Sequence, residues 1–267
     1  MCLLLISDGH HKLIRWRLVT HSAIDGFSRL VVFCKCSENN RAETVYNLFL
    51  KAVEQYGLPS RVRCDQGKEN VCVARHMLRH RGVDRNSVLV GSSVHNQCIE
   101  RYWRDMHRCV TSIYYKLFYY LEHNSLLNPH DNFHLFALHY VFIPRVNRSL
   151  NQFVNAWNSH GVRSECGQSP NQLFTAGSLR LRNSGLTAFD FFDNVPESYG
   201  SHDSEETSSD ENEDSGQEIE VPQTRINISD EDFSQLCSNI NPLDESDDFG
   251  ADLFMSTLEL LQSFNTQ

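Results

Sequence analysis

The sequence lacks long apolar runs. No stretch approaches the roughly 18 consecutive apolar residues that a helix needs to cross a bilayer. The short apolar start, CLLLIS, ends at once in Asp8. This start is typical of a strand and not of a signal peptide, and we expect no membrane partner.

The CxxC spacing that is typical of zinc sites is also missing. The nine cysteines are odd in number, scattered and never spaced CxxC, and the 13 histidines do not form the HxxxH…CxxC pattern of a zinc module. Cys34 and Cys36 are spaced so that they could grip a metal, but alternation along a strand favours two small hydrophobic side chains on one face. We therefore expect reduced thiols and a nuclear location, with the cytoplasm as a second possible compartment.

Basic residues are nearly absent from the last quarter of the chain. Residues 200–267 contain one Arg against 18 Asp and Glu, whereas residues 1–199 contain 23 Lys and Arg against 16 Asp and Glu. The net charge of -10 therefore combines a first part near +7 with a second part near -17. A basic globular part favours a polyanionic partner.

The sequence does contain a clear change of hydrophobic period. Five segments alternate or run apolar as strands do: 2–7, 13–24, 30–36, 61–64 and 87–90. Four segments place apolar residues three and four apart, as helices do: 40–57, 71–80, 99 onward and 133–157. Asn39 or Asn40 is expected to cap the first helix, Ile113 and Leu117 to continue the apolar stripe of the third, and Pro144 to kink the fourth. The order predicts an α/β fold, a mixed five-stranded sheet flanked by helices.

The composition also predicts the domain boundaries. We expect a core over 1–178, a linker over 179–199, an acidic disordered tail over 200–250 and a short amphipathic segment over 251–267. The acidic tail has too few apolar residues to offset the entropy lost on ordering.

Three acids fall at the ends of predicted elements. Asp8 closes the first strand, Asp65 closes the fourth, and Glu100 opens the long helix. If the first and fourth strands are neighbours, these carboxylates converge. Two hard cations held by such oxygen ligands can stabilise the attacking and leaving oxygens of a phosphodiester. Isolated aspartates at strand ends are, however, usually turn residues.

The motifs around these acids resemble a known family. The segments LISDGHHKLIRW, AIDGFSRLVVF, RVRCDQGKEN and SSVHNQCIERYWRD, with SPNQLFTAG at the end, are similar to the integrase catalytic core of retroviruses and transposons. The similarity runs from about residue 4 to 177. More specifically, the chain resembles the integrase-core-domain proteins that animal and fungal genomes encode. It implies an RNase H-like fold.

The resemblance also implies an active site. The family's catalytic, metal-binding acids fall on Asp8, Asp65 and Glu100, with 34 residues between the last two, one fewer than is usual in the family. They would hold two Mg²⁺ or Mn²⁺ ions while water or a DNA 3′-hydroxyl attacks phosphorus. Asp25, 17 residues after Asp8, is a rival for the first acid, but it more naturally caps the turn at Gly26.

Residues around the three acids are candidates for DNA contact. Arg104 and Arg108 follow Glu100 at four-residue intervals, so they share its helix face, although such a ladder also suits surface ion pairs. The other candidates lie in the loops beside Asp65 and Glu100: Arg63, Gln66, Gly67, Lys68, His95, Asn96 and Gln97. The alternative interpretation is that these seven residues have no role in DNA binding: they are solvated loop residues, and His95 only precedes the helix.

Three functions stay open. The first is a DNA integrase or nuclease, active as a monomer, a homodimer or a higher oligomer. The second is a domesticated, non-catalytic nucleic-acid-binding or scaffold protein that keeps the fold. The third is an RNA-cleaving enzyme, but the IDGFSR and HNQxIER motifs argue against it.

The acidic tail would cover the basic DNA face or only aid solubility. Its terminal helix, with Leu253, Phe254, Leu258 and Leu261 on one face, would dock on a protein partner or on the core.

Overall fold

The computed structural model of the 267-residue chain describes residues 4–65, 67–82, 85–91, 97–184, 221–224 and 226–265. Within these ranges, no helix combines the length and the apolar character needed to cross a membrane.

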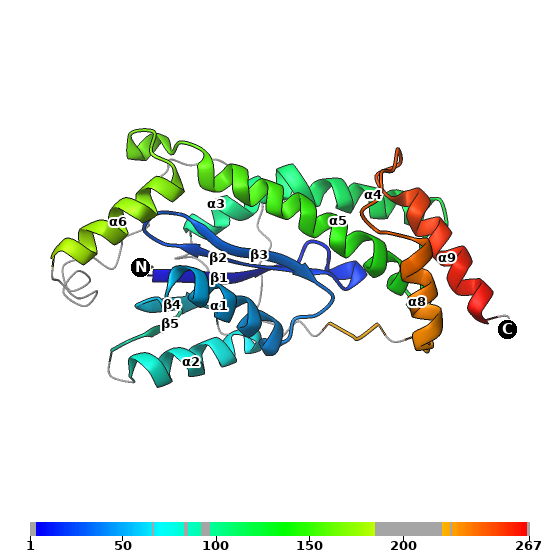
Figure 1. The fold of residues 1–267 in the computed structure, drawn as a ribbon, viewed down its shortest axis with the longest axis horizontal. Helices are drawn as coiled ribbons and strands as arrows, with labels where there is room; N and C mark the ends of the chain where they lie inside the picture. The colour runs from blue at the N-terminus through cyan, green and yellow to red at the C-terminus, as the bar shows by residue number, and fades with distance from the viewer. Residues whose placement is uncertain are drawn as a thin grey trace.

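A five-stranded mixed sheet lies at the centre of the fold (Figure 1). Its strands are β1 (Leu4–His10), β2 (Val19–Asp25), β3 (Val31–Ser37), β4 (Arg61–Cys64) and β5 (Val88–Val90). They are arranged in the order β3-β2-β1-β4-β5, with β1, β2 and β3 antiparallel and β1, β4 and β5 parallel. The predicted mixed sheet flanked by helices is confirmed, including the expected contact between the first and fourth strands.

The segment before β2 differs from the prediction of a strand over 13–24. Residues Ile14–Trp16 form a 3₁₀ helix that ends at Arg17, whose φ of 57° is left-handed. The Trp16 side chain is fully buried. An apolar run that is buried on all sides gives the same sequence signal in a tight turn as in a strand, so periodicity alone could not separate the two.

Two helices cover one face of the sheet. They are α1 (Ala42–Tyr56) and α2 (Val71–Arg81), which follows a 3₁₀ turn at Lys68–Asn70. Phe49 and Met77 are their largest fully buried side chains. Arg41, not Asn39 or Asn40, is the first flanking residue of α1, while Asn39 Oδ1 accepts from Thr44 Oγ1 at 2.6 Å.

The other face carries a long helical rod. It comprises α3 (Gln97–Met106), a π-helical turn (His107–Thr111) and α4 (Ser112–His123). Because a π turn holds more residues than an α turn, the buried positions shift by one beyond it. Tyr114 and Phe118 face the core, whereas Ile113 is 47% exposed. The predicted apolar stripe is therefore wrong at Ile113, whereas Leu117 is partly buried against the core as predicted.

Helices α5 (Asn132–Ser159) and α6 (Pro170–Ser184) complete the core, with a 3₁₀ turn at Arg163–Glu165 between them. Pro144 lies inside α5, which continues through it as one helix. Asp131 caps the start of α5 by accepting from the Phe133 backbone N–H at 2.8 Å. Helix α6 continues to Ser184, six residues past residue 178.

The C-terminal arm, residues 221–224 and 226–265, contradicts the prediction of disorder for the part of 200–250 that lies within it. It forms α8 (Asp230–Asn239) and α9 (Ala251–Asn265), which lie beside α5 at one end of the molecule (Figure 1). Leu236, Phe254 and Leu258 are buried in the core cluster. Nine acidic residues lie in this segment, but its spaced apolar residues suffice to dock it. Residues 201–220 lie outside the described residues.

Candidate active site

Asp8 lies on the sheet face that the helical rod covers. Ile6 of β1 pairs with Arg63 of β4, and Asp8 and Asp65 each follow two positions later in this parallel register. The Asp8 carboxyl group extends toward the rod, and the charge of Asp65 acts on it, so the two acids lie near each other. The prediction that the acids of the first and fourth strands converge follows from this pairing.

Two donors hold Asp8. The Trp103 indole Nε1 donates to Oδ2 at 2.9 Å, and the Gly9 backbone N–H donates to Oδ1 at 2.8 Å. Trp103 belongs to α3, so this bond ties the rod to β1 beside the site. The sequence places Trp103 in an apolar stripe, and its position there gives no signal that its N–H reaches a carboxylate.

Asp65 directly follows β4 and is held by its own loop. Asn70 Nδ2 donates to Oδ1 at 2.9 Å, and the Gly67 backbone N–H donates to the same oxygen at 3.3 Å. Glu69 is a fourth acid beside it: burial and the charge of Asp65 raise the Glu69 pKa. A Cβ on Gly67 would lie 2.1 Å from a carboxylate oxygen of Glu69, so the absence of a side chain at Gly67 makes room for this carboxylate.

Glu100 lies in the first turn of α3 and is exposed. Nearby protein atoms nevertheless desolvate its carboxyl group and raise its pKa, while Arg104, four residues later, lowers it. The Arg104 guanidinium therefore lies within electrostatic reach of Glu100, as their shared helix face predicts.

The electrostatics of Asp8 connect the three acids. Burial raises its pKa to about 7, the bonds from Trp103 and Gly9 oppose this shift, and the charges of Asp65 and Glu100 add to it. The Asp65 and Glu100 carboxylates are therefore both near enough to disfavour the charged form of Asp8. Such oxygen donors fit a hard divalent cation, which would relieve the repulsion. Among the described residues, however, no three His, Cys, Asp or Glu side chains are already arranged as a metal-binding group.

Asp25 occupies a different environment. Its Oδ2 accepts from the Ser28 backbone N–H at 2.9 Å and from Ser28 Oγ at 2.6 Å, and it is buried. Asp25 pairs with Leu5, whereas Asp8 pairs with Ser22 farther along β1. Asp25 therefore caps the turn after β2, as the turn chemistry predicts.

A histidine packs against this site. His10 stacks on Trp103 with ring centroids 5.2 Å apart and lies 5.8 Å from the His107 ring. Burial, together with His107 and Lys12, lowers the His10 pKa to about 3. The wall beside Asp8 is therefore aromatic and neutral.

The proposed DNA-contacting residues are placed unevenly. Arg104, Arg108 and Lys68 are exposed, and Arg63 and Gly67 are half-buried. Gln66, His95 and Asn96 lie outside the described residues, and Gln97 begins α3 with a side chain that is likewise not described.

Cys34 and Cys36 pack in the core, where burial raises both thiol pKa values, in agreement with their predicted hydrophobic role.

Comparison with known proteins gives one family. The family model "Integrase core domain" matches residues 3–188. No curated protein matches the chain.

Solved structures with a similar arrangement are integrase cores of low sequence identity. The HTLV-2 integrase catalytic core domain in complex with magnesium is 15% identical, with a TM-score of 0.43 over 65% of this chain and 96% of that one. The catalytic core of BIV integrase is 14% identical, with a TM-score of 0.45 over 68% of this chain and 99% of that one.

Proposed function

Because the chain belongs to the integrase core domain family, we propose that it is an integrase-like polynucleotidyl transferase that cleaves or joins DNA phosphodiester bonds. The observation that carries the proposal is the placement of Asp8 on β1 and of Asp65 directly after the paired strand β4, with Glu100 in the first turn of α3, near enough for the charges of Asp65 and Glu100 to act on Asp8. Carboxylates brought together at an energetic cost are typical of a site that a ligand completes.

Two Mg²⁺ or Mn²⁺ ions are part of the proposal, with Asp8, Asp65 and Glu100 as their ligands. When bound, such ions activate the attacking oxygen and stabilise the leaving oxygen of a phosphodiester. The chain's own contribution is placement. Trp103 and Gly9 orient Asp8, while Asn70 and the Gly67 backbone orient Asp65.

Substrate binding would depend on exposed cations near the acids. Arg104 lies on α3 with Glu100, Arg108 lies in the π turn that follows α3, and Lys68 lies exposed three residues after Asp65. Guanidinium and ammonium groups there would neutralise phosphates and hold the scissile bond in place. Water or a DNA 3′-hydroxyl then forms the new phosphorus–oxygen bond as the old one breaks. A DNA substrate also supports a nuclear location for the protein.

The test is metal-dependent cleavage or joining of labelled DNA by the full chain. We expect activity with Mg²⁺ or Mn²⁺, and its loss in Asp65→Asn, because an amide is a weaker ligand for a hard cation. Asp105→Asn, on α3 but outside the carboxylate group, is the matched control and should stay active. Full activity of Asp65→Asn would refute the mechanism, and an RNA–DNA hybrid as the preferred substrate would indicate an RNase.

A non-catalytic DNA-binding protein is the second candidate. The observation that favours it is the absence, among the described residues, of a metal-binding group that is already in place. In that case the chain binds DNA without a metal requirement, and no nicked or joined product appears with either cation.

The acidic segment before the arm has a proposed role of its own. Nine Asp and Glu residues lie between 201 and 220, opposite in charge to the core. We keep the hypothesis that this segment competes with DNA for the basic face. Truncation near Pro196 would also remove the docked arm, so the sharper test replaces these nine acids with amides. Equal DNA affinity at low salt would leave the segment with a role in solubility only.

A further inference from the structure

The helical rod carries a largely exposed row of side chains along its length, in which only Ser112 is half-buried. The members lie three or four residues apart, and we refer to them as the rod row: Glu100, Arg104, Arg108, Ser112, Lys116, Tyr119 and His123. Beside it, Tyr115 is 37% exposed and Tyr120 is 61% exposed. Cations and tyrosines thus continue well beyond the two arginines nearest the catalytic acids.

The π turn explains why the row runs straight. In an α-helix each residue advances by about 100°, so positions four apart drift gradually around the axis. The extra residue of the π turn at His107–Thr111 takes up this drift. Consistent with this, Met106, Val110, Tyr114 and Phe118 are buried at four-residue intervals on the opposite side.

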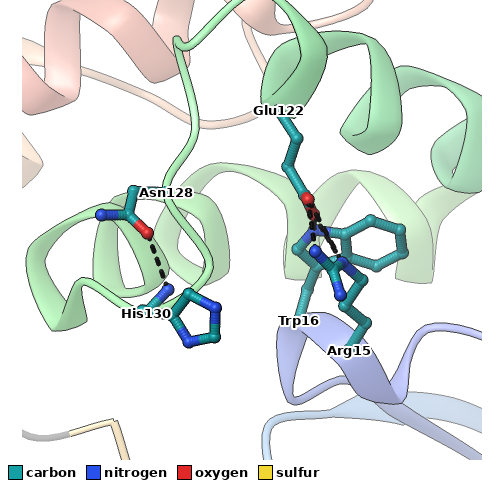
Figure 2. A network of polar contacts seen from close by, with 5 residues as sticks. All are labelled: Arg15, Trp16, Glu122, Asn128 and His130. Atoms are coloured by element: carbon teal, nitrogen blue, oxygen red, sulfur yellow. Dashed lines mark hydrogen bonds and ion pairs between the residues drawn. The ribbon is translucent and has the colours of Figure 1, made fainter.

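Acidic residues do not offset the charge of the row. Between 101 and 123 the sequence holds Asp105 and Glu122 against four Arg and Lys. Figure 2 shows that Glu122 is already occupied: Arg15 Nη2 donates to its Oε2 at 2.8 Å, and the Trp16 indole N–H donates to its Oε1. The Arg15 guanidinium also lies 5.8 Å from the centre of the Tyr119 ring. This corner therefore presents a fixed aromatic ring next to a cation.

We propose that α4 extends the DNA-binding surface beyond the catalytic acids, with Lys116, Tyr119 and Tyr120 contacting the substrate. The inference rests on the proposed function and adds a second contact region to it. Lys116 would neutralise a phosphate, and tyrosines would donate hydroxyl groups to phosphates or stack on unpaired bases. From Glu100 to His123 the rod is about 35 Å long, because each helical residue rises about 1.5 Å. That length matches about ten nucleotides of duplex.

The experiment measures DNA binding in EDTA, where cleavage does not interfere. Fluorescence anisotropy compares a blunt duplex with the same duplex carrying a single-stranded tail, across a salt series. Lys116→Ala should reduce the slope of log affinity against log salt by about one, since one phosphate contact is lost. Tyr120→Ala should weaken binding about fivefold or more, mainly on the tailed duplex. Both side chains are exposed, so thermal unfolding should remain unchanged.

Lys51→Ala is the matched control, an exposed lysine on α1, which covers the opposite face of the sheet. It should bind both probes as the unmodified chain does. If Lys116→Ala and Tyr120→Ala also bind normally, the extended contact region is disproved, while metal-dependent cleavage can still succeed. If the variants lose affinity but the unmodified chain neither cleaves nor joins DNA, the contact region stands and the catalytic proposal fails.

Discussion

The Trp103 indole N–H donates a hydrogen bond to Asp8 Oδ2 across 2.9 Å. The bond links a residue of the helical rod to a carboxylate of β1, and burial raises the pKa of that carboxyl to about 7. A carboxylate with a fixed orientation binds a cation with less loss of entropy than a free one. Trp103 is thus a positioning residue for the proposed metal site.

Replacing Trp103 with Phe tests this positioning role. Loss of the indole donor should raise the Mg²⁺ concentration needed for half-maximal activity by about tenfold or more, as is common when a group orienting a metal ligand is removed. Trp157→Phe is the control, because it removes a similar bond, from Nε1 to the Arg29 carbonyl at 3.0 Å, on α5. An equal Mg²⁺ requirement in both variants would show that Trp103 only packs.

Asp25 and Asp65 should respond oppositely to the same change. Asp25→Asn disturbs two bonds from Ser28 in a buried turn, so it should lower the free energy of unfolding by about 1–3 kcal/mol and leave the metal requirement unaltered. Asp65→Asn should leave the free energy of unfolding nearly unaltered and abolish the response to Mg²⁺. Denaturant unfolding and Mg²⁺ titration of both variants decide the assignment, which fails if Asp25→Asn, still folded, loses its response to Mg²⁺.

The sequence predicts the sheet and the positions of the three acids well, because strand alternation and strand ends are local signals. Asp65 follows the end of β4 and Glu100 lies in the first turn of α3, whereas Asp8 lies inside β1, two residues before its end and not at the end that the sequence suggests. Roles that depend on tertiary contacts leave no such signal. An apolar spacing shows that Trp103 is buried, but not that its N–H meets a carboxylate.

Two errors have the same origin in packing. The π turn shifts burial from Ile113 to Tyr114, a one-residue change that a regular helical period cannot anticipate. Disorder over 200–250 is a sound expectation from average composition, yet Leu236 and Ile240 are buried against the core. Docking of the arm needs only a few apolar contacts and the hydrogen bonds that α5 side chains donate to backbone carbonyls of the arm.

Glu122 predicts a specific dependence on pH. The Arg15 guanidinium is the main cause of its lowered pKa, which lies below the usual 4.5 in the folded state. The ion pair therefore stabilises the fold above pH 4.5 and loses its effect as pH falls through the lower folded value. Glu122→Gln should cost about 1–2 kcal/mol at neutral pH. Thermal melts of both proteins should converge as pH falls from 4.5 through the lower folded pKa of Glu122, and a constant difference across this range would contradict the assignment.

Gly250 should control docking of the C-terminal arm. Its φ is +99°, and a Cβ there would lie 2.7 Å from Arg145 Nε on α5. That arginine also donates from Nη2 to the Asp244 carbonyl at 2.7 Å, so the clash would disturb the bond that anchors the arm.

Gly250→Ala should therefore release α8 and α9 from α5, and hydrogen exchange should show lost protection in all three helices. Gly57→Ala separates backbone strain from the clash, because Gly57 has a φ of +85° with no atom within 4 Å of an added Cβ. It should cost about 1 kcal/mol and leave exchange in the arm unchanged. If the two variants exchange alike in α8 and α9, close approach to Arg145 does not hold the arm, and the buried Phe254 and Leu258 must be sufficient for docking.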